Sequence, residues 1–201
     1  MEKEEFPQGY GYKFGGEQKD MAETMTSLGI ALLVAIFLMY AVMAAQFESF
    51  IYPAIVLVTL PLGIIGVALG LFVTGFPVSV TVLIGIIMLA GIVVNNAIIL
   101  IDYINILRAR GIERDEAIKT AGKTRLRPIF MTVATAVLGY VPLAFGIGAG
   151  SDFYQPMAIS VAFGLTMSTV LTLIVIPVLY SVVDDIGEWV KGLFKRGKSL
   201  E

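Results

Sequence analysis

Four stretches of this sequence contain no Asp, Glu, Lys or Arg: residues 24–47, 49–101, 128–151 and 153–183. A helix needs about 20 apolar residues to cross the roughly 30 Å hydrocarbon core of a bilayer, and the second stretch exceeds two such crossings. Only 15% of the 201 residues are charged, against about 25% in soluble domains. The sequence therefore predicts an integral membrane protein.

The apolar pattern divides into about five membrane spans. Each should be a helix, because lipid offers no hydrogen-bond partner to an open backbone. A further stretch, residues 111–122, has the charge spacing of a short amphipathic surface helix. We predict an all-α, polytopic membrane helix bundle of about five transmembrane helices plus a short cytoplasmic surface helix. The predicted spans are residues 24–45, 53–74, 78–107, 124–147 and 155–183.

The distribution of Lys and Arg predicts the orientation, because these residues are enriched in cytoplasmic loops. Seven of the fourteen lie within residues 108–127, and four more lie within residues 191–198. Five crossings then place the N-terminus outside and the C-terminus in the cytoplasm. We predict an extracytoplasmic segment (1–22), a transmembrane bundle (23–184) and a cytoplasmic tail (185–201). No signal peptide precedes the polar first segment, so we expect an upstream span and a larger protein.

Several kinds of chemistry are disfavoured by composition. The sequence has no Cys and no His, which removes thiolate metal sites, disulfides and the commonest general base. No arrangement of Ser, Thr, Lys and carboxylates resembles an activated nucleophile, and there is no glycine-rich phosphate loop. We expect no enzymatic activity, no cofactor, no metal site and no nucleic-acid partner.

Polar residues inside predicted spans require an explanation, because they are costly at membrane depth. Asn95 and Asp102 are seven residues apart on the third span, and Arg125 and Thr132 are seven apart on the fourth. This spacing places each pair on one helix face and predicts a polar seam between the two spans. Simple interhelical hydrogen bonds could also explain Asn95 and Asn96. Snorkelling to the interface could explain Asp102.

Three motifs inside the bundle, together with an N-terminal pattern, carry a resemblance to RND (resistance-nodulation-division) multidrug efflux pumps. AQFESF (45–50) followed by Pro53 resembles the corner between two helices of a repeat in these pumps. GIVVNNAIILIDYIN (91–105) is similar to their tenth helix, and TRLRPIFMT (124–132) to the start of the eleventh. Residues 7–10 with 15–17 resemble the end of the last porter segment before the eighth helix.

The resemblance implies an architecture and a mechanism. Such pumps have twelve membrane helices in two repeats, periplasmic porter domains and a trimeric assembly in the inner membrane. As antiporters they couple proton influx to the export of hydrophobic and amphiphilic compounds, which gives multidrug resistance. Their essential carboxylates lie on the fourth helix. This chain resembles helices eight to twelve only, with residues 1–22 as a remnant of the porter domain.

Matching positions imply the site residues. Asn95 stands where well-known members have Lys, Asn96 matches their Asn, and Arg125 and Thr132 match their Arg and Thr. These four are the predicted proton-relay partners, with Asp102 as a possible auxiliary. No Asp, Glu, Lys or His lies in the central part of any span, so the proton-carrying carboxylate must come from elsewhere.

We therefore expect the C-terminal membrane part of a proton-driven efflux pump, a fragment inactive without its N-terminal half. Its other expected partners are membrane lipid and hydrophobic small-molecule substrates. The alternative is a self-assembling helical module, such as a half-transporter, a channel or a scaffold, in which a second copy of the chain is the partner.

Overall fold

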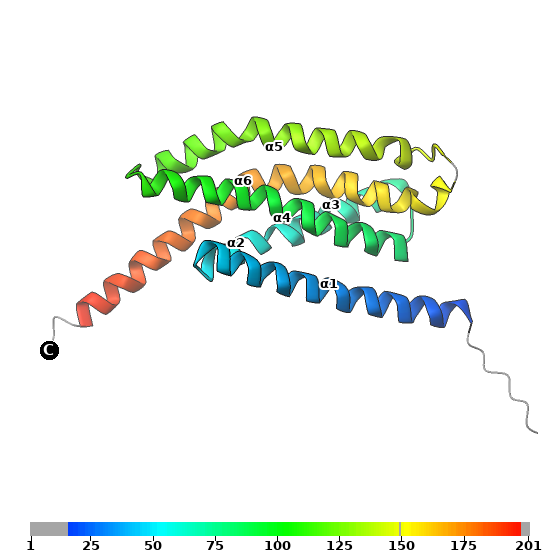
Figure 1. Cartoon of the computed structure of the whole chain (residues 1–201), viewed down its shortest axis with the longest axis horizontal. Coiled ribbons are helices and arrows are strands. Elements are labelled where there is room, and N and C mark those ends of the chain that lie inside the picture. The colour runs from blue at the N-terminus through cyan, green and yellow to red at the C-terminus, as the bar shows by residue number, and fades with distance from the viewer. Residues whose placement is uncertain (1–15, 149, 198–201) are drawn as a thin grey trace, which may run out of the picture.

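The structure, a computed structural model, describes residues 16–148 and 150–197, with side chains described over 19–148 and 150–186. Figure 1 shows long helices lying side by side, and no strand occurs in the described ranges. Residues 1–15 of the predicted extracytoplasmic segment (1–22), with most of the porter-like motif (7–10 and 15–17), lie outside these ranges. Residues 198–201 of the predicted tail (185–201) also lie outside them. The helices are α1 (Glu17–Phe47), α2 (Ile51–Leu57), α3 (Thr59–Thr74), α4 (Val80–Ala109), α5 (Arg114–Ala144) and α6 (Ser151–Gly197).

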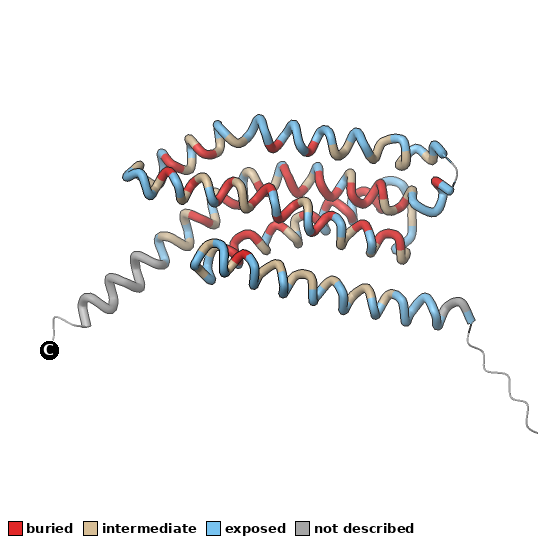
Figure 2. The backbone as a smooth tube through the Cα atoms, in the orientation of Figure 1, coloured by how far each residue is buried: buried red, intermediate tan, exposed pale blue. Residues whose placement is uncertain are grey.

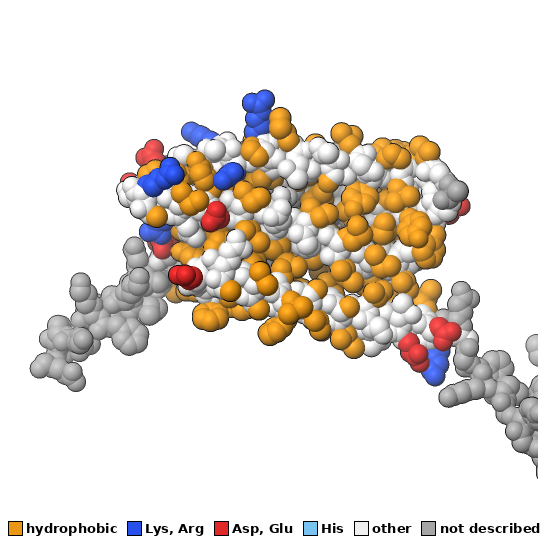
Figure 3. All heavy atoms as spheres, viewed as in Figure 1, with side chains coloured by type: hydrophobic (Ala, Val, Ile, Leu, Met, Phe, Trp, Pro, Cys, Tyr) orange, Lys and Arg blue, Asp and Glu red, His pale blue; other side chains and the backbone are white. Residues whose placement is uncertain are grey.

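Five helical segments of the described chain are long and apolar enough to cross a membrane, which confirms the predicted all-α membrane bundle. The short α2 and the longer α3 together form the second span. Figure 3 shows a broad band of hydrophobic side chains, with charged side chains gathered near the α4–α5 turn and the start of α1. This separation is what a bilayer requires of a spanning protein.

The second span is interrupted at Val58, between α2 and α3. Pro61 has no backbone N–H and cannot bond to the carbonyl four residues earlier, so the regular ladder fails there. The chain adapts locally, because the Val58 N–H donates to Ile55 O (3.3 Å) and the Thr59 hydroxyl donates to Val56 O (2.7 Å). These two bonds give the carbonyls of the last turn of α2 a partner at the break.

The expected surface helix is present, but it is continuous with the fourth span. Gly111, at φ 84°, closes the end of α4, and α5 then runs from Arg114 through the predicted helix into the membrane segment. The residues between 114 and 127 include no Pro and none with a left-handed backbone. No residue in this region ends the helix, and α5 also continues through Pro128, which lies inside it.

The core lies where α6 packs against α3, α4 and α5. In Figure 2 the buried residues concentrate on these inner helices, whereas α1 and the outer face of α5 are largely exposed. Such outer faces are apolar (Phe37 of α1 is 68% exposed), as expected of surfaces that contact lipid.

Glycines bring α3 and α6 into backbone contact. A Cβ at Gly66 would lie 2.7 Å from the Phe163 carbonyl oxygen and 2.8 Å from the Gly164 Cα. A Cβ at Gly164 would lie 2.4 Å from the Leu89 side chain of α4. Small residues permit this approach, which is a main source of helix association in lipid. The contact holds α6 firmly beside α3 and α4.

Candidate functional site

The structure separates the two neighbouring asparagines of α4. Asn96 is buried (5% exposed), whereas Asn95 is exposed. Adjacent residues on a helix point about 100° apart, so one can face the bundle while the other faces outward. Asp102, seven residues after Asn95, is exposed as well. The predicted seam thus has an outward-facing part on α4, formed by Asn95 and Asp102.

Arg125 of α5 contacts α4 through an aromatic ring. Its guanidinium carbon lies 4.5 Å from the centroid of the Tyr103 ring, a cation–π arrangement. The Arg125 Nε is buried and has no hydrogen-bond partner among the described atoms. No ion pair joins Arg125 to Asp102 in the described part of the chain. This open N–H can donate a charge-assisted hydrogen bond to a carboxylate.

Thr132, one seam position further along α5, is exposed, and its hydroxyl donates to Pro128 O within its own helix (3.0 Å). The structure therefore brings Arg125 to α4, through Tyr103, and no hydrogen bond among the described side chains joins Asn95, Asp102, Arg125 and Thr132 to one another. Asn95 and Asp102 of α4 and Thr132 of α5 are exposed, whereas Arg125 is partly buried.

Sequence reasoning missed the polar residues of α6. A small cavity lies between α4, α5 and α6, with Asn96 and Ile129 on one side and Ser168, Thr169 and Thr172 on the other. The last three are buried. Thr172 lies four residues after Ser168 and three after Thr169, spacings that bring it to the same helix face as each of them. A search for hydroxyl residues at helical spacing in the fifth span could have found them.

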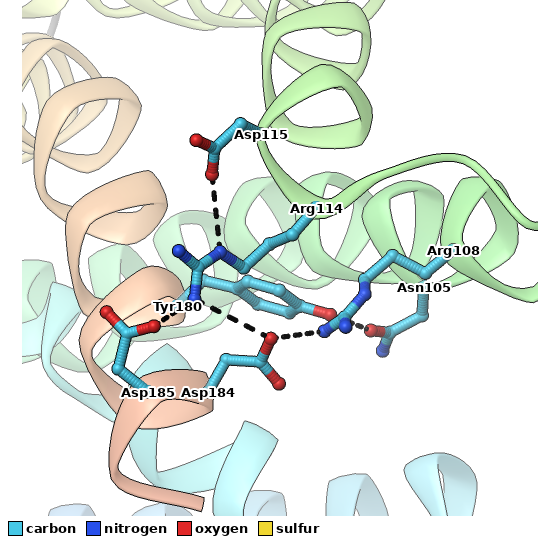
Figure 4. Close-up of polar contacts among 7 residues, drawn as sticks. All are labelled: Asn105, Arg108, Arg114, Asp115, Tyr180, Asp184 and Asp185. Carbon is cyan, nitrogen blue, oxygen red and sulfur yellow. Dashed lines mark hydrogen bonds and ion pairs between the residues drawn. The ribbon is translucent and has the colours of Figure 1, made fainter. Parts of the chain in front are cut away.

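A second missed cluster joins α4, α5 and α6 at the end of the bundle (Figure 4). Arg108 donates to Asp184 (2.6 Å), and Arg114 contacts Asp184 (3.9 Å), Asp185 and Asp115 (3.3 Å). Beside it the Tyr180 hydroxyl donates to Asn105 Oδ1 at 2.8 Å. These contacts connect the end of α4 and the start of α5 to α6.

Replacing Arg108 with Ala should loosen this junction. The Arg108 and Asp184 side chains are 32% and 25% exposed, so the loss should be about 1 kcal/mol, the upper range for solvent-accessible pairs. Amide hydrogen exchange of α6 near Asp184, in lipid, would measure it. The matched control is Arg110→Ala, two residues along and exposed. Equal exchange rates in the two variants would contradict a structural role for the pair.

The comparisons with known proteins agree with this geometry. The model of the AcrB/AcrD/AcrF family matches residues 1–184. The chain belongs to this family. The resemblance to RND efflux pumps that the motifs predicted is therefore confirmed.

Curated relatives of this AcrB/AcrD/AcrF family member include the swarming motility protein SwrC of Bacillus subtilis (strain 168), 39% identical over 183 residues. Another is the cobalt-zinc-cadmium resistance protein CzcA of Cupriavidus metallidurans, 36% identical over 174 residues. These matches cover 90% and 87% of this chain, but 17% and 16% of the relatives. The chain thus spans less than a fifth of the length of these relatives.

The comparison with solved structures also finds efflux pumps. The chain is similar to a heavy metal efflux pump in two crystal forms, with TM-scores of 0.78 and 0.74 and sequence identities of 31% and 32%. The matches cover 89% and 85% of this chain, and 18% and 17% of the pump. The helices of this chain therefore have the arrangement found in one part of a much longer efflux transporter.

Proposed function

We propose that this chain is the C-terminal membrane part of a proton-motive-force-driven RND efflux pump. It corresponds to helices eight to twelve of such a pump, lies in the inner membrane with its N-terminus outside and its C-terminus in the cytoplasm, and acts within a trimer. In this proposal it neither carries the coupling proton nor catalyses a reaction. It supplies neutral and cationic partners to a carboxylate on the N-terminal half, and it is inactive without that half.

One observation carries the proposal: polar groups lie uncovered within the membrane span. Asn95, in the middle of α4, is exposed, and so is Thr132 of α5. An amide facing hydrocarbon is unfavourable, so such a face normally contacts protein or a water-filled cavity. Another segment packed on this face would remove the cost.

Arg125 supports the same conclusion through its charge. Its Nε is buried without a partner, and the nearby Tyr103 ring offers only a cation–π contact. A deprotonated carboxylate brought next to the guanidinium would be stabilised, and protonation would release it. This difference is what a proton-coupled switch needs. Asn95 and Asn96 can only hydrogen-bond, so Arg125 would carry the charge response.

For the exported substrate, we propose hydrophobic or amphiphilic compounds. A second candidate is divalent metal cations, since CzcA and the heavy metal efflux pump are named for metals. The described residues contain no group of three or more Asp, Glu, His or Cys that could hold a metal. A cation would therefore have to bind elsewhere in the complete pump.

Growth of cells with and without the complete pump separates these two substrate classes. Detergents and lipophilic dyes form one panel, and zinc, cobalt and cadmium salts form the other. Resistance to the first panel alone supports the proposed substrate class. Resistance to the metal salts alone replaces it with the second candidate, and resistance to neither contradicts the export function.

The exposed Asn95 also permits the alternative, a module that assembles from copies of this chain. In that case the α4 faces of two copies would meet at Asn95. An Asn95→Cys variant in lipid should then cross-link in high yield, while Phe37→Cys, on the exposed outer face of α1, serves as the control. The efflux-pump proposal expects no cross-linking above the level of that control.

A further inference from the structure

The cavity between α4, α5 and α6 has a volume of about 10 Å³ and is lined by both polar and apolar side chains. It lies on the buried side of α4, whereas Asn95 lies on the exposed side of the same helix. Asn96 borders it from α4, Ile129 from α5, and Ser168, Thr169 and Thr172 from α6. A volume of roughly 10–15 Å³ is what one water molecule requires.

Two of the lining side chains have buried polar atoms with no partner. They are the Asn96 Nδ2 and the Thr172 Oγ1, on residues that are 5% and 4% exposed. A buried polar atom without a hydrogen bond costs roughly 1–3 kcal/mol, and few remain in folded proteins. Two of them at one cavity therefore indicate that something fills it.

Thr172 differs from the other two threonines of α6, and from Thr132 and Thr135 of α5. The hydroxyls of Thr132, Thr135, Thr166 and Thr169 each donate to the carbonyl four residues earlier, at 2.7–3.0 Å. The Thr172 hydroxyl makes no such bond. A threonine in a helix normally takes this partner when nothing better is near. Its hydroxyl is therefore free to bond to a group that fills the cavity.

We infer that this cavity binds one water molecule, which accepts from the Asn96 amide and exchanges a hydrogen bond with the Thr172 hydroxyl. The unpartnered group of Asn96 is a donor, and a metal cation cannot accept a hydrogen bond. An anion could accept one, but no Lys or Arg lines the cavity, and burial of an unpaired ion is far more costly than burial of water. Water also serves either orientation of the amide, since it both donates and accepts.

The bound water makes α6 part of the polar region around Asn96. Neighbouring hydroxyls are already used elsewhere, because Thr169 donates to Leu165 O (2.7 Å) and Ser168 contacts Thr59 O (3.5 Å). Asn96 and Thr172 are thus linked through the water and not through each other. This site is independent of the proposed transport function, and a pump without proton coupling would still contain it.

Magic-angle-spinning NMR of the 201-residue chain in bilayers can detect the water directly. The sequence has only three asparagines, at 95, 96 and 105, so selective ¹⁵N-asparagine labelling with Asn95→Gln and Asn105→Gln variants assigns the Asn96 amide. In the unmodified chain, magnetisation should pass from water protons to the Asn96 side-chain amide. Absence of this transfer would overturn the inference.

Variants of Thr172 sharpen the test. Thr172→Val should reduce the transfer to Asn96 by roughly threefold or more, since the water then keeps too few polar partners, and Thr172→Ser should retain it. Thr166→Val is the matched control, because Thr166 is exposed and bonds within its own helix. Equal transfer in the Thr172→Val, Thr166→Val and unmodified chains would also overturn the inference. If Thr172→Val does not fold, the result with the unmodified chain decides.

Discussion

Replacing Arg125 with Ala in the complete pump should nearly abolish proton-coupled export. The guanidinium stacks 4.5 Å from the Tyr103 ring centroid and keeps a buried Nε without a partner. If a carboxylate of another segment uses that donor, the substitution leaves a buried charge without its partner, at a cost of about 3–5 kcal/mol. If about 3 kcal/mol of this cost raises the free-energy barrier to transport, the export rate decreases by roughly a hundredfold.

The measurement is substrate efflux driven by an imposed pH gradient, with equal amounts of each variant in the membrane. Arg127→Ala is the control, because Arg127 is exposed and lies two residues along the same helix. Its loss should change export by less than about twofold, as expected for a solvated surface charge. Normal export by the Arg125→Ala pump would remove Arg125, and with it the seam, from the mechanism.

Substituting Gly66 with Ala should give the largest loss of stability from a single added methyl group. The new Cβ would lie 2.7 Å from both the Phe163 carbonyl oxygen and the Met167 Cβ, and 2.8 Å from the Gly164 Cα. Two of these three atoms belong to the backbone, so a side-chain rotation cannot relieve the clash. Helices α3 and α6 must move apart, and overpacking of this kind costs about 1–3 kcal/mol.

The matched control should change stability in the opposite direction. Gly91 lies inside α4, and a Cβ there would meet nothing within 4 Å. Gly91→Ala should therefore stabilise the chain by about 0.5–1 kcal/mol, through the loss of glycine's backbone freedom in the unfolded state. Reversible unfolding in mixed micelles would give both free energies. Equal effects at the two positions would show that the close contact of α3 with α6 is not formed.

The sequence was most informative where lipid imposes a strong constraint. Long, continuous uncharged runs without strand alternation favour helices in a membrane, so the number of spans and their approximate bounds could be predicted. Motifs such as TRLRPIFMT identified the family, because their residues are ordered and specific. The sequence pattern predicted a surface helix separate from the fourth span, whereas the two form one helix, because no residue in that region breaks it.

The direction of each side chain could not be predicted, for a physical reason. Helix α4 is apolar on nearly every side, so its pattern does not distinguish a face toward protein from a face toward lipid. The burial of Asn96 and the exposure of Asn95 follow from how α6 packs against α4, a contact between residues far apart in the chain. The pairing of Arg114 with Asp185 depends on the same packing.

The most direct test of the central claim is a flux measurement in sealed vesicles. The chain alone, and the chain assembled with the N-terminal half of the pump, would each be reconstituted at the same density. A pH gradient would be imposed, and substrate export and proton influx would be followed together. We predict coupled fluxes only for the assembled protein, and none above those of protein-free vesicles for the chain alone. Coupled export by the chain alone would show that it carries its own proton and does not need the N-terminal half.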